Sequence, residues 1–137
     1  MKKAVYIFLA IVICCCSISL VACAYSKLKA SFVRFDIGER QDDFYLDFTV
    51  KFENKTNSTV TIDANDFDIE INGKKKIVGS FLYEFQDTFI AYPSIEKNET
   101  LILRVRVIAE VNRGEHNTIL VKYNNSVLVD DNVYFNK

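Results

Sequence analysis

The sequence predicts an all-β fold, namely a single antiparallel β-sandwich of about seven to eight strands that follows an N-terminal export segment. Three observations lead to this prediction. From residue 30 onward the apolar residues recur with a period of two, as in strands that have one buried face. Clusters of turn-forming residues interrupt these runs at a spacing of roughly 8–12 residues. No Pro-, Gly- or Ser-rich linker divides the chain, so a single domain is expected.

The first two predicted strands cover residues 30–37 and 44–53. The second has the clearest alternation of the whole chain, because every other residue is apolar and the residues between them are mostly polar. Its apolar set is Phe44, Leu46, Phe48, Val50 and Phe52. Residues 54–58 then form a polar turn cluster.

Residues 59–78 contain a predicted hairpin. A β-branched run at 59–63 precedes a second alternating strand at 66–71, in which Phe67, Ile69 and Ile71 alternate with acidic residues. Asn72-Gly73 follows, and this pair strongly predicts a two-residue hairpin because both residues adopt positive φ at low cost. Residues 74–78 would be the return strand.

Residues 80–93 are ambiguous between strand and helix. Their aromatic residues share one face with a strand period and another with a helix period, and the all-β context favours the strand. Most of these rings are expected in the core, whereas any exposed ones would mark a partner site. The aromatic set, and thus the candidate partner patch, is Phe81, Tyr83, Phe85, Phe89 and Tyr92.

The C-terminal part contains three further predicted strands, at residues 101–109, 119–123 and 127–135. The first alternates apolar residues with Arg104 and Arg106, which are expected to face outward and to pair with acids across the sheet. The last two are separated by the turn Asn124-Asn125-Ser126.

The N-terminus has a different composition from the rest of the chain. Lys2 and Lys3 precede an uncharged run at residues 4–24, and a basic start, an apolar stretch and small residues at the end are the parts of a secretory signal. The run is also long enough to span a bilayer, since about 20 residues at a rise of ~1.5 Å cover the ~30 Å hydrocarbon core. An uncleaved membrane anchor is therefore an alternative.

Two cleavage sites are visible at the end of this run. Ala22-Cys23-Ala24 has the small-x-small pattern of ordinary signal peptidase sites, which would place the cut after Ala24. Leu20-Val21-Ala22-Cys23 resembles the bacterial lipobox, which consists of an aliphatic residue, a tolerant position, a small residue and a cysteine. The resemblance implies cleavage between Ala22 and Cys23 and a Cys23 that carries fatty acyl chains such as palmitate. It divides the chain into a signal (residues 1–22), a lipidated tether (23–29) and a domain (30–137) on the outer side of the cell membrane.

The cysteine and charge distributions fit an exported domain without disulfides. All four cysteines lie at or before Cys23, so a disulfide framework within the domain is excluded. Loss of Lys2 and Lys3 leaves 15 basic and 18 acidic side chains, a net charge of about −3. Weak acidity without a basic cluster argues against nucleic acid and against electrostatic docking on anionic lipids, so the acyl chains alone are expected to hold the membrane.

Three stretches of the domain resemble the small immunoglobulin-like domains of bacterial lipoproteins. They are VKFENKTNSTVTI at residues 50–62, DFDIEINGK at 66–74, and residues 89–107, where PSIEKNET precedes a long alternating strand. Many proteins of this kind belong to families of unknown function, and related sandwiches occur in secreted mycobacterial antigens. The resemblance covers roughly residues 30–135 and implies an immunoglobulin-like sandwich, but no activity. The chain departs from the pattern in lacking a glycine after Pro93.

No residue pattern predicts a catalytic or metal site. His116 is the only histidine, and a general base or metal ligand needs convergent partners that no second His or domain Cys supplies. The acidic run at residues 63–70 does not match a calcium loop because Phe67 occupies the fifth position, so a solvated strand face is expected. The chain contains no nucleophile elbow and no glycine-rich phosphate loop. The sequence therefore predicts a protein that is not an enzyme and that needs no cofactor.

The functional prediction is a monomeric, non-catalytic binding or accessory module whose partner is a protein or a cell-wall component. A structural or immunity-type protein that shields or inhibits a partner is a second possibility. If the chain were an enzyme with an unrecognised site, His116 and Asp66 would be the residues to test.

Overall fold

The computed structural model describes residues 28–40 and 43–136. The predicted signal, the lipobox and Cys23 lie outside the described residues, so the prediction of a lipidated N-terminus is not addressed by the fold. In the described part of the chain, no helix is long and apolar enough to cross a membrane.

The described residues form strands almost throughout, which confirms the all-β prediction. They contain eleven strands and one short 3₁₀ helix, η1 (Ala64–Asp66). The strand count exceeds the predicted seven to eight because three of the strands contain only two residues each, too few to show a period. In chain order the strands are β1 (Leu28–Arg40), β2 (Asp43–Asn54), β3 (Val60–Thr61), β4 (Phe67–Ile71), β5 (Lys74–Lys76), β6 (Ser80–Tyr83), β7 (Phe89–Ile90), β8 (Ser94–Ile95), β9 (Thr100–Ile108), β10 (His116–Tyr123) and β11 (Ser126–Tyr134).

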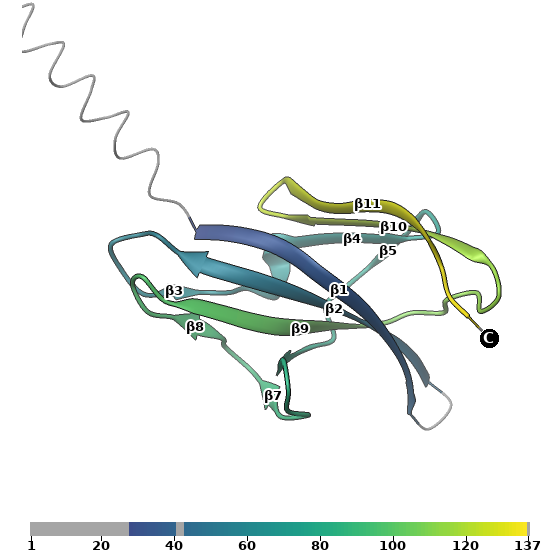
Figure 1. Cartoon of the computed structure of the whole chain (residues 1–137), viewed down its shortest axis with the longest axis horizontal. Coiled ribbons are helices and arrows are strands. Elements are labelled where there is room, and N and C mark those ends of the chain that lie inside the picture. The colour runs from purple at the N-terminus through teal and green to yellow at the C-terminus, as the bar shows by residue number, and fades with distance from the viewer. Residues whose placement is uncertain (1–27, 41–42, 137) are drawn as a thin grey trace, which may run out of the picture.

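Two antiparallel sheets pack face to face (Figure 1). The first has the order β1-β2-β9-β6-β7, and the second has the order β11-β10-β4-β5. With the eight longer strands lettered in sequence, these orders read A-B-E-D and G-F-C-C′, which is the arrangement of the immunoglobulin fold. The small pair β3-β8 closes one end of the sandwich.

The core lies between the two sheets, where the alternating positions of the sequence point inward. In β2 the inward residues are Leu46, Phe48, Val50 and Phe52, and all four are fully buried. Five rings form a buried aromatic cluster with neighbouring centroids 4.9–6.4 Å apart. The buried aromatic cluster consists of Phe48, Phe52, Phe67, Phe81 and Tyr123.

Asparagine residues form the hairpin turns. Asn72 and Gly73 both have positive φ, at 51° and 73°, which confirms the predicted β4-β5 hairpin. Asn124 and Asn125 repeat this conformation at 47° and 63° between β10 and β11.

Asn54, at the end of β2, explains the polar turn that follows it. Its side chain is fully buried, and its Nδ2 donates to the carbonyl oxygens of Ser58 at 2.8 Å and Ile95 at 2.9 Å. Its Oδ1 accepts from the backbone N–H of Thr56 at 2.9 Å. One side chain thus ties β2 to its own turn and to β8, because a buried amide is stable only when its donors and acceptors are satisfied.

The two lateral sides of the sandwich differ. On one side the long edge strands β1 and β11 lie next to each other (Figure 1), and the ring of Phe35 in β1 meets that of Phe135 at 6.4 Å. On the other side the edges are β5 and β7, with three and two residues. We call these the closed side and the open side. Residues 80–93 lie on the open side as short strands and loops, so the strand alternative was correct.

Candidate binding groove

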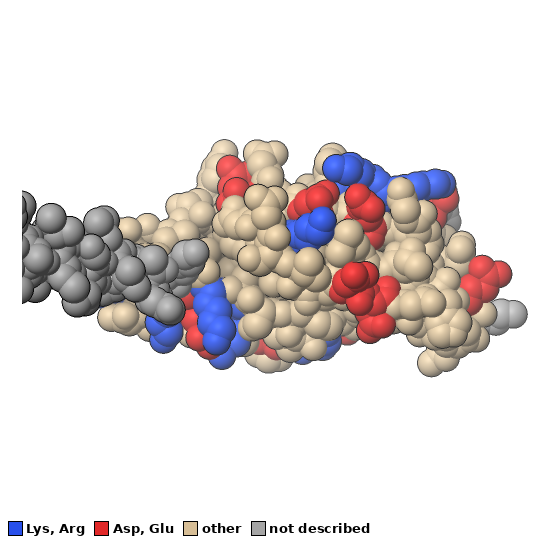
Figure 2. All heavy atoms as spheres, turned by 90° about the horizontal axis from the view of Figure 1, so that it is seen from above, with Lys and Arg blue, Asp and Glu red and all other residues tan. Residues whose placement is uncertain are grey.

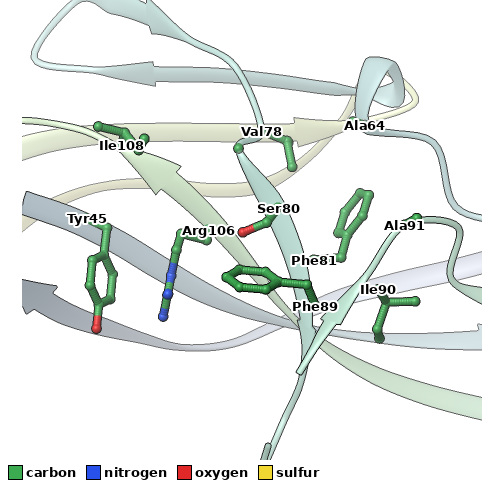
Figure 3. Close-up of a pocket in the computed structure, with 11 residues that line it drawn as sticks. Tyr45, Ala64, Val78, Ser80, Phe81, Phe89, Ile90, Ala91, Arg106 and Ile108 are labelled. Atoms are coloured by element: carbon green, nitrogen blue, oxygen red, sulfur yellow. The ribbon is translucent and has the colours of Figure 1, made fainter. Parts of the chain in front are cut away.

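A groove with a volume of about 780 Å³ lies on the open side, where the chain crosses from β5 to β6 (Figure 3). This volume falls within the range of known ligand sites, about 300–1,000 Å³. The lining comes from five separate parts of the sequence: Tyr45, Ala64, Val78, Gly79, Ser80, Phe81, Phe89, Ile90, Ala91, Arg106 and Ile108.

The groove has two walls, one on each face of the first sheet. The inner wall contacts the core and is formed by Ala64, Val78, Phe81 and Ile90. The outer wall continues the solvent-facing surface of the sheet and is formed by Tyr45, Phe89, Arg106 and Ile108. The groove therefore wraps around the sheet edge at Ser80.

A stack of three residues shapes the outer wall. Gly38 in β1 pairs with Tyr45, and a Cβ at Gly38 would lie 2.0 Å from the Tyr45 ring, so only glycine leaves room for the ring across β1. The guanidinium of Arg106 lies over a face of this ring, with its central carbon 3.7 Å from the ring centroid. Figure 3 shows Tyr45 and Arg106 side by side, with Phe89 on the far side of Arg106.

A buried carboxylate holds the guanidinium of Arg106 in place. Its Nε and Nη2 donate to the two oxygens of Asp47 at 2.8 Å each, and Asp47 is only 1% exposed. The hydrogen bonds to Asp47 raise the pKa of Arg106 above its ordinary value, so the guanidinium stays charged. The sequence prediction that Arg104 and Arg106 pair with acids across the sheet is confirmed, because both reach Asp47.

Arg104 connects this ion pair to the β6-β7 loop (residues 84–88). It lies 3.5 Å from Asp47, and it donates to the carbonyl oxygens of Tyr83 at 3.2 Å and Gln86 at 2.9 Å. It also donates to Asp87 at 2.7 Å. At the start of the loop, Glu84 accepts from Arg34 of β1 at 3.2 Å. The loop is thereby held over the outer face of the sheet.

The five predicted patch residues do not share one environment. Phe81 lies in the core at 4% exposure, as expected for most of the set, but that expectation was wrong for the other four. Tyr83, Phe85, Phe89 and Tyr92 are 43%, 85%, 57% and 81% exposed. Tyr83 is the last residue of β6 and pairs with Leu103 of β9. Phe85 and Tyr92 lie outside the strands, so no strand pairing turns their rings inward. We call these four the exposed aromatic patch, and only Phe89 of them lines the groove.

The other residues considered from the sequence do not gather into a site. His116 is exposed at the start of β10, and its ring lies 5.3 Å from that of Tyr134. Asp68 is half-buried in β4 and lies near Lys75 and Lys122, at 3.6 and 4.0 Å. Among the described residues, no group of three or more His, Cys, Asp or Glu side chains could hold a metal ion.

The surface charges are mixed. On the face seen in Figure 2, Lys and Arg side chains lie among Asp and Glu side chains rather than apart from them. This face thus offers no large area of one sign.

Nine of the eleven described lining residues were not singled out as functional from the sequence, and four of them form the polar and outer parts of the groove: Tyr45, Ser80, Arg106 and Ile108. Two signals were available. Ile108 is an apolar residue at a solvent-facing position of β9, and it is 63% exposed. Gly38 lies within a strand, where glycine often marks the close approach of another group.

The groove lining has few polar side chains. Its described lining contains one guanidinium, from Arg106, and two hydroxyls, from Ser80 and Tyr45, but neither a carboxylate nor a histidine or cysteine. Comparison of the chain with family models, curated proteins and solved structures gives no significant match.

Proposed function

We propose that this protein is an exported lipoprotein, held on the outer side of the membrane by acylated Cys23, whose β-sandwich binds a partner in the groove without catalysing a reaction. The observation that carries the binding role is the groove itself. Its volume of about 780 Å³ combines with exposed apolar side chains at Phe89 and Ile108. Exposed apolar surface grouped around a concavity is characteristic of interaction sites.

The anchoring part of the proposal rests on the residues of the N-terminus. A basic start, an apolar run and the sequence Leu20-Val21-Ala22-Cys23 occur in the order that lipoprotein export requires. Two acyl chains give stable attachment, whereas one gives only marginal binding. The predicted absence of an electrostatic membrane contact leaves the lipid as the sole anchor.

Intact mass of the membrane-extracted protein tests the anchor. We expect a chain that begins at Cys23 and is heavier by a diacylglyceryl group, and we expect Cys23→Ala to lack this modification. An unmodified chain that retains Met1 would show that the apolar run is an uncleaved membrane anchor instead.

Site-specific crosslinking in intact cells tests the groove. A photoreactive amino acid at position 89 is compared with one at position 134, since Phe89 and Tyr134 are aromatic and similarly exposed, at 57% and 51%. We expect a discrete crosslinked product from position 89 alone. Equal products from both positions, or none from position 89, would refute the groove as the binding site.

A further inference from the structure

The groove runs beside an open strand edge. β6 pairs with β9 over all four of its residues, but β7 covers only Phe81 and Leu82 on the other side. Within the described residues, Ser80 therefore has no strand neighbour on that side. Unpaired edges of this kind are templates for an added strand.

Three other edge strands have features that discourage such pairing. β5 consists of Lys74, Lys75 and Lys76, β1 has a bulge between Phe32 and Arg34, and β11 presents Asp130 and Asp131 to solvent. Charges and bulges on an edge prevent strand addition. The start of β6, by contrast, offers a serine and a glycine.

The two walls match the alternating side chains of a strand. Successive side chains of a strand point to opposite faces of its sheet. A strand placed beside Ser80 would direct one side chain to the inner wall of Ala64, Val78 and Phe81, and the next to the outer wall of Arg106 and Phe89. The inner wall is apolar, so the side chain that it receives should be apolar as well.

The outer wall calls for an acceptor with negative charge. Arg104 and Arg106 together carry two positive charges against the one buried carboxylate of Asp47, and Asp87, which also pairs with Arg104, is 86% exposed to screening solvent. Both hydrogen bonds from Arg106 to Asp47 use Nε and Nη2. The Nη1 group of Arg106 donates no hydrogen bond to a described residue, so it remains available to an acceptor in the groove. Arg106 is also the only charged residue of the described lining.

We propose that the groove takes an extended segment of a partner polypeptide as an added strand beside Ser80, with an apolar side chain on the inner wall and an adjacent acidic side chain at Arg106. This inference rests on the proposed function of the groove and specifies its ligand. Main-chain hydrogen bonds would supply affinity and the alternate side chains specificity, as in other cases of strand addition.

A displayed library of random decapeptides provides the probe. The full chain, purified in detergent micelles, is used for selection, and the same chain carrying Ile108→Glu is used for counter-selection, since this change places a carboxylate on the outer wall. We expect enriched peptides in which apolar residues alternate with an acidic residue. For a synthetic enriched peptide, we expect Ile108→Glu to weaken binding at least about tenfold, while Ile77→Glu, which is 86% exposed and outside the groove, has little effect.

Backbone N-methylation of the same peptide tests the strand geometry. Alternate amides of an added strand face β6, so methylation of one alternate set should abolish binding while methylation of the other set is tolerated. Peptides with apolar residues at helical spacing, or equal tolerance at all amides, would overturn the inference.

The outcomes separate this inference from the proposed function. If no peptide enriches over the Ile108→Glu counter-selection while position 89 still crosslinks to a partner in cells, the groove binds something other than an extended polypeptide and the inference falls alone. If position 89 also fails to crosslink, the proposed function falls with it.

Discussion

The buried aromatic cluster and the exposed aromatic patch contain the same kinds of residue in opposite environments. Phe48, Phe52 and Tyr123 sit on strands that pair along most of their length, so every second side chain is turned into the core. Phe85 and Tyr92 flank the two-residue strand β7, and both are more than 80% exposed. The difference shows that hydrophobicity alone does not decide which rings form the core, because Phe85 and Tyr92 lie outside the paired strands and stay exposed.

The largest expected effect comes from breaking the buried aromatic cluster. Phe52→Ala should lower the free energy of unfolding by about 3–5 kcal/mol, because it removes a fully buried ring and leaves a cavity. Denaturant unfolding measures this change. Phe85→Ala is the matched control and should change stability by less than about 0.5 kcal/mol, because its ring is 85% exposed. Equal losses in the two variants would contradict the comparison.

Through Arg104, Asp47 of the first sheet is connected to the β6-β7 loop, which carries Phe85 of the exposed aromatic patch. Asp47→Ala should lower stability by about 3 kcal/mol, at the low end of the range for breaking a buried ion pair, since the two arginines are 13% and 15% exposed. It should also speed hydrogen exchange in residues 84–88, which Arg104 would hold less firmly. If Asp47→Ala unfolds like the native chain, the ion pair does not support the outer wall.

Alkaline unfolding distinguishes a ring in the cluster from one in the patch. Burial raises the pKa of Tyr123 to about 12, against about 10 in an unfolded chain. The raised value means that stability is complete below about pH 10 and is lost as the pH rises through 12, by up to about 2–3 kcal/mol. Tyr123→Phe should flatten the stability profile in this window, and Tyr92→Phe should leave it as in the native chain. A profile unchanged by Tyr123→Phe would place this hydroxyl in water.

The smallest effect is expected at the exposed ion pair between Arg34 and Glu84, which also holds the β6-β7 loop. Arg34→Ala removes the hydrogen bond to Glu84, yet it should not measurably change the unfolding midpoint, because exposed ion pairs contribute little. Hydrogen exchange in residues 84–88 should still rise slightly. A large drop in the midpoint would mean that the loop is part of the folding core.

The sequence was sufficient for the fold class but not for the groove. Period-two alternation at residues 44–53 and 66–71, together with Asn72-Gly73, predicted β2, β4 and the β4-β5 hairpin, because these signals are local. The groove could not be predicted in the same way, since Tyr45, Ser80, Phe89 and Arg106 meet only through sheet pairing. The exposure of Phe85 depends likewise on a loop held by Arg104, which lies 18 residues from Gln86 in sequence.

The register of the first hairpin also determines how the domain bears force. β1 begins at Leu28, which pairs with Asn54 at one end of β2, whereas Tyr45 of the groove lies near the other end, opposite Gly38. Tension between the N-terminal side of the chain and a ligand in the groove would therefore run along β1. It would load the β1-β2 hydrogen bonds together in shear rather than peel them apart one by one, so the proposed ligand would pull on the domain in the direction in which this hairpin is strongest.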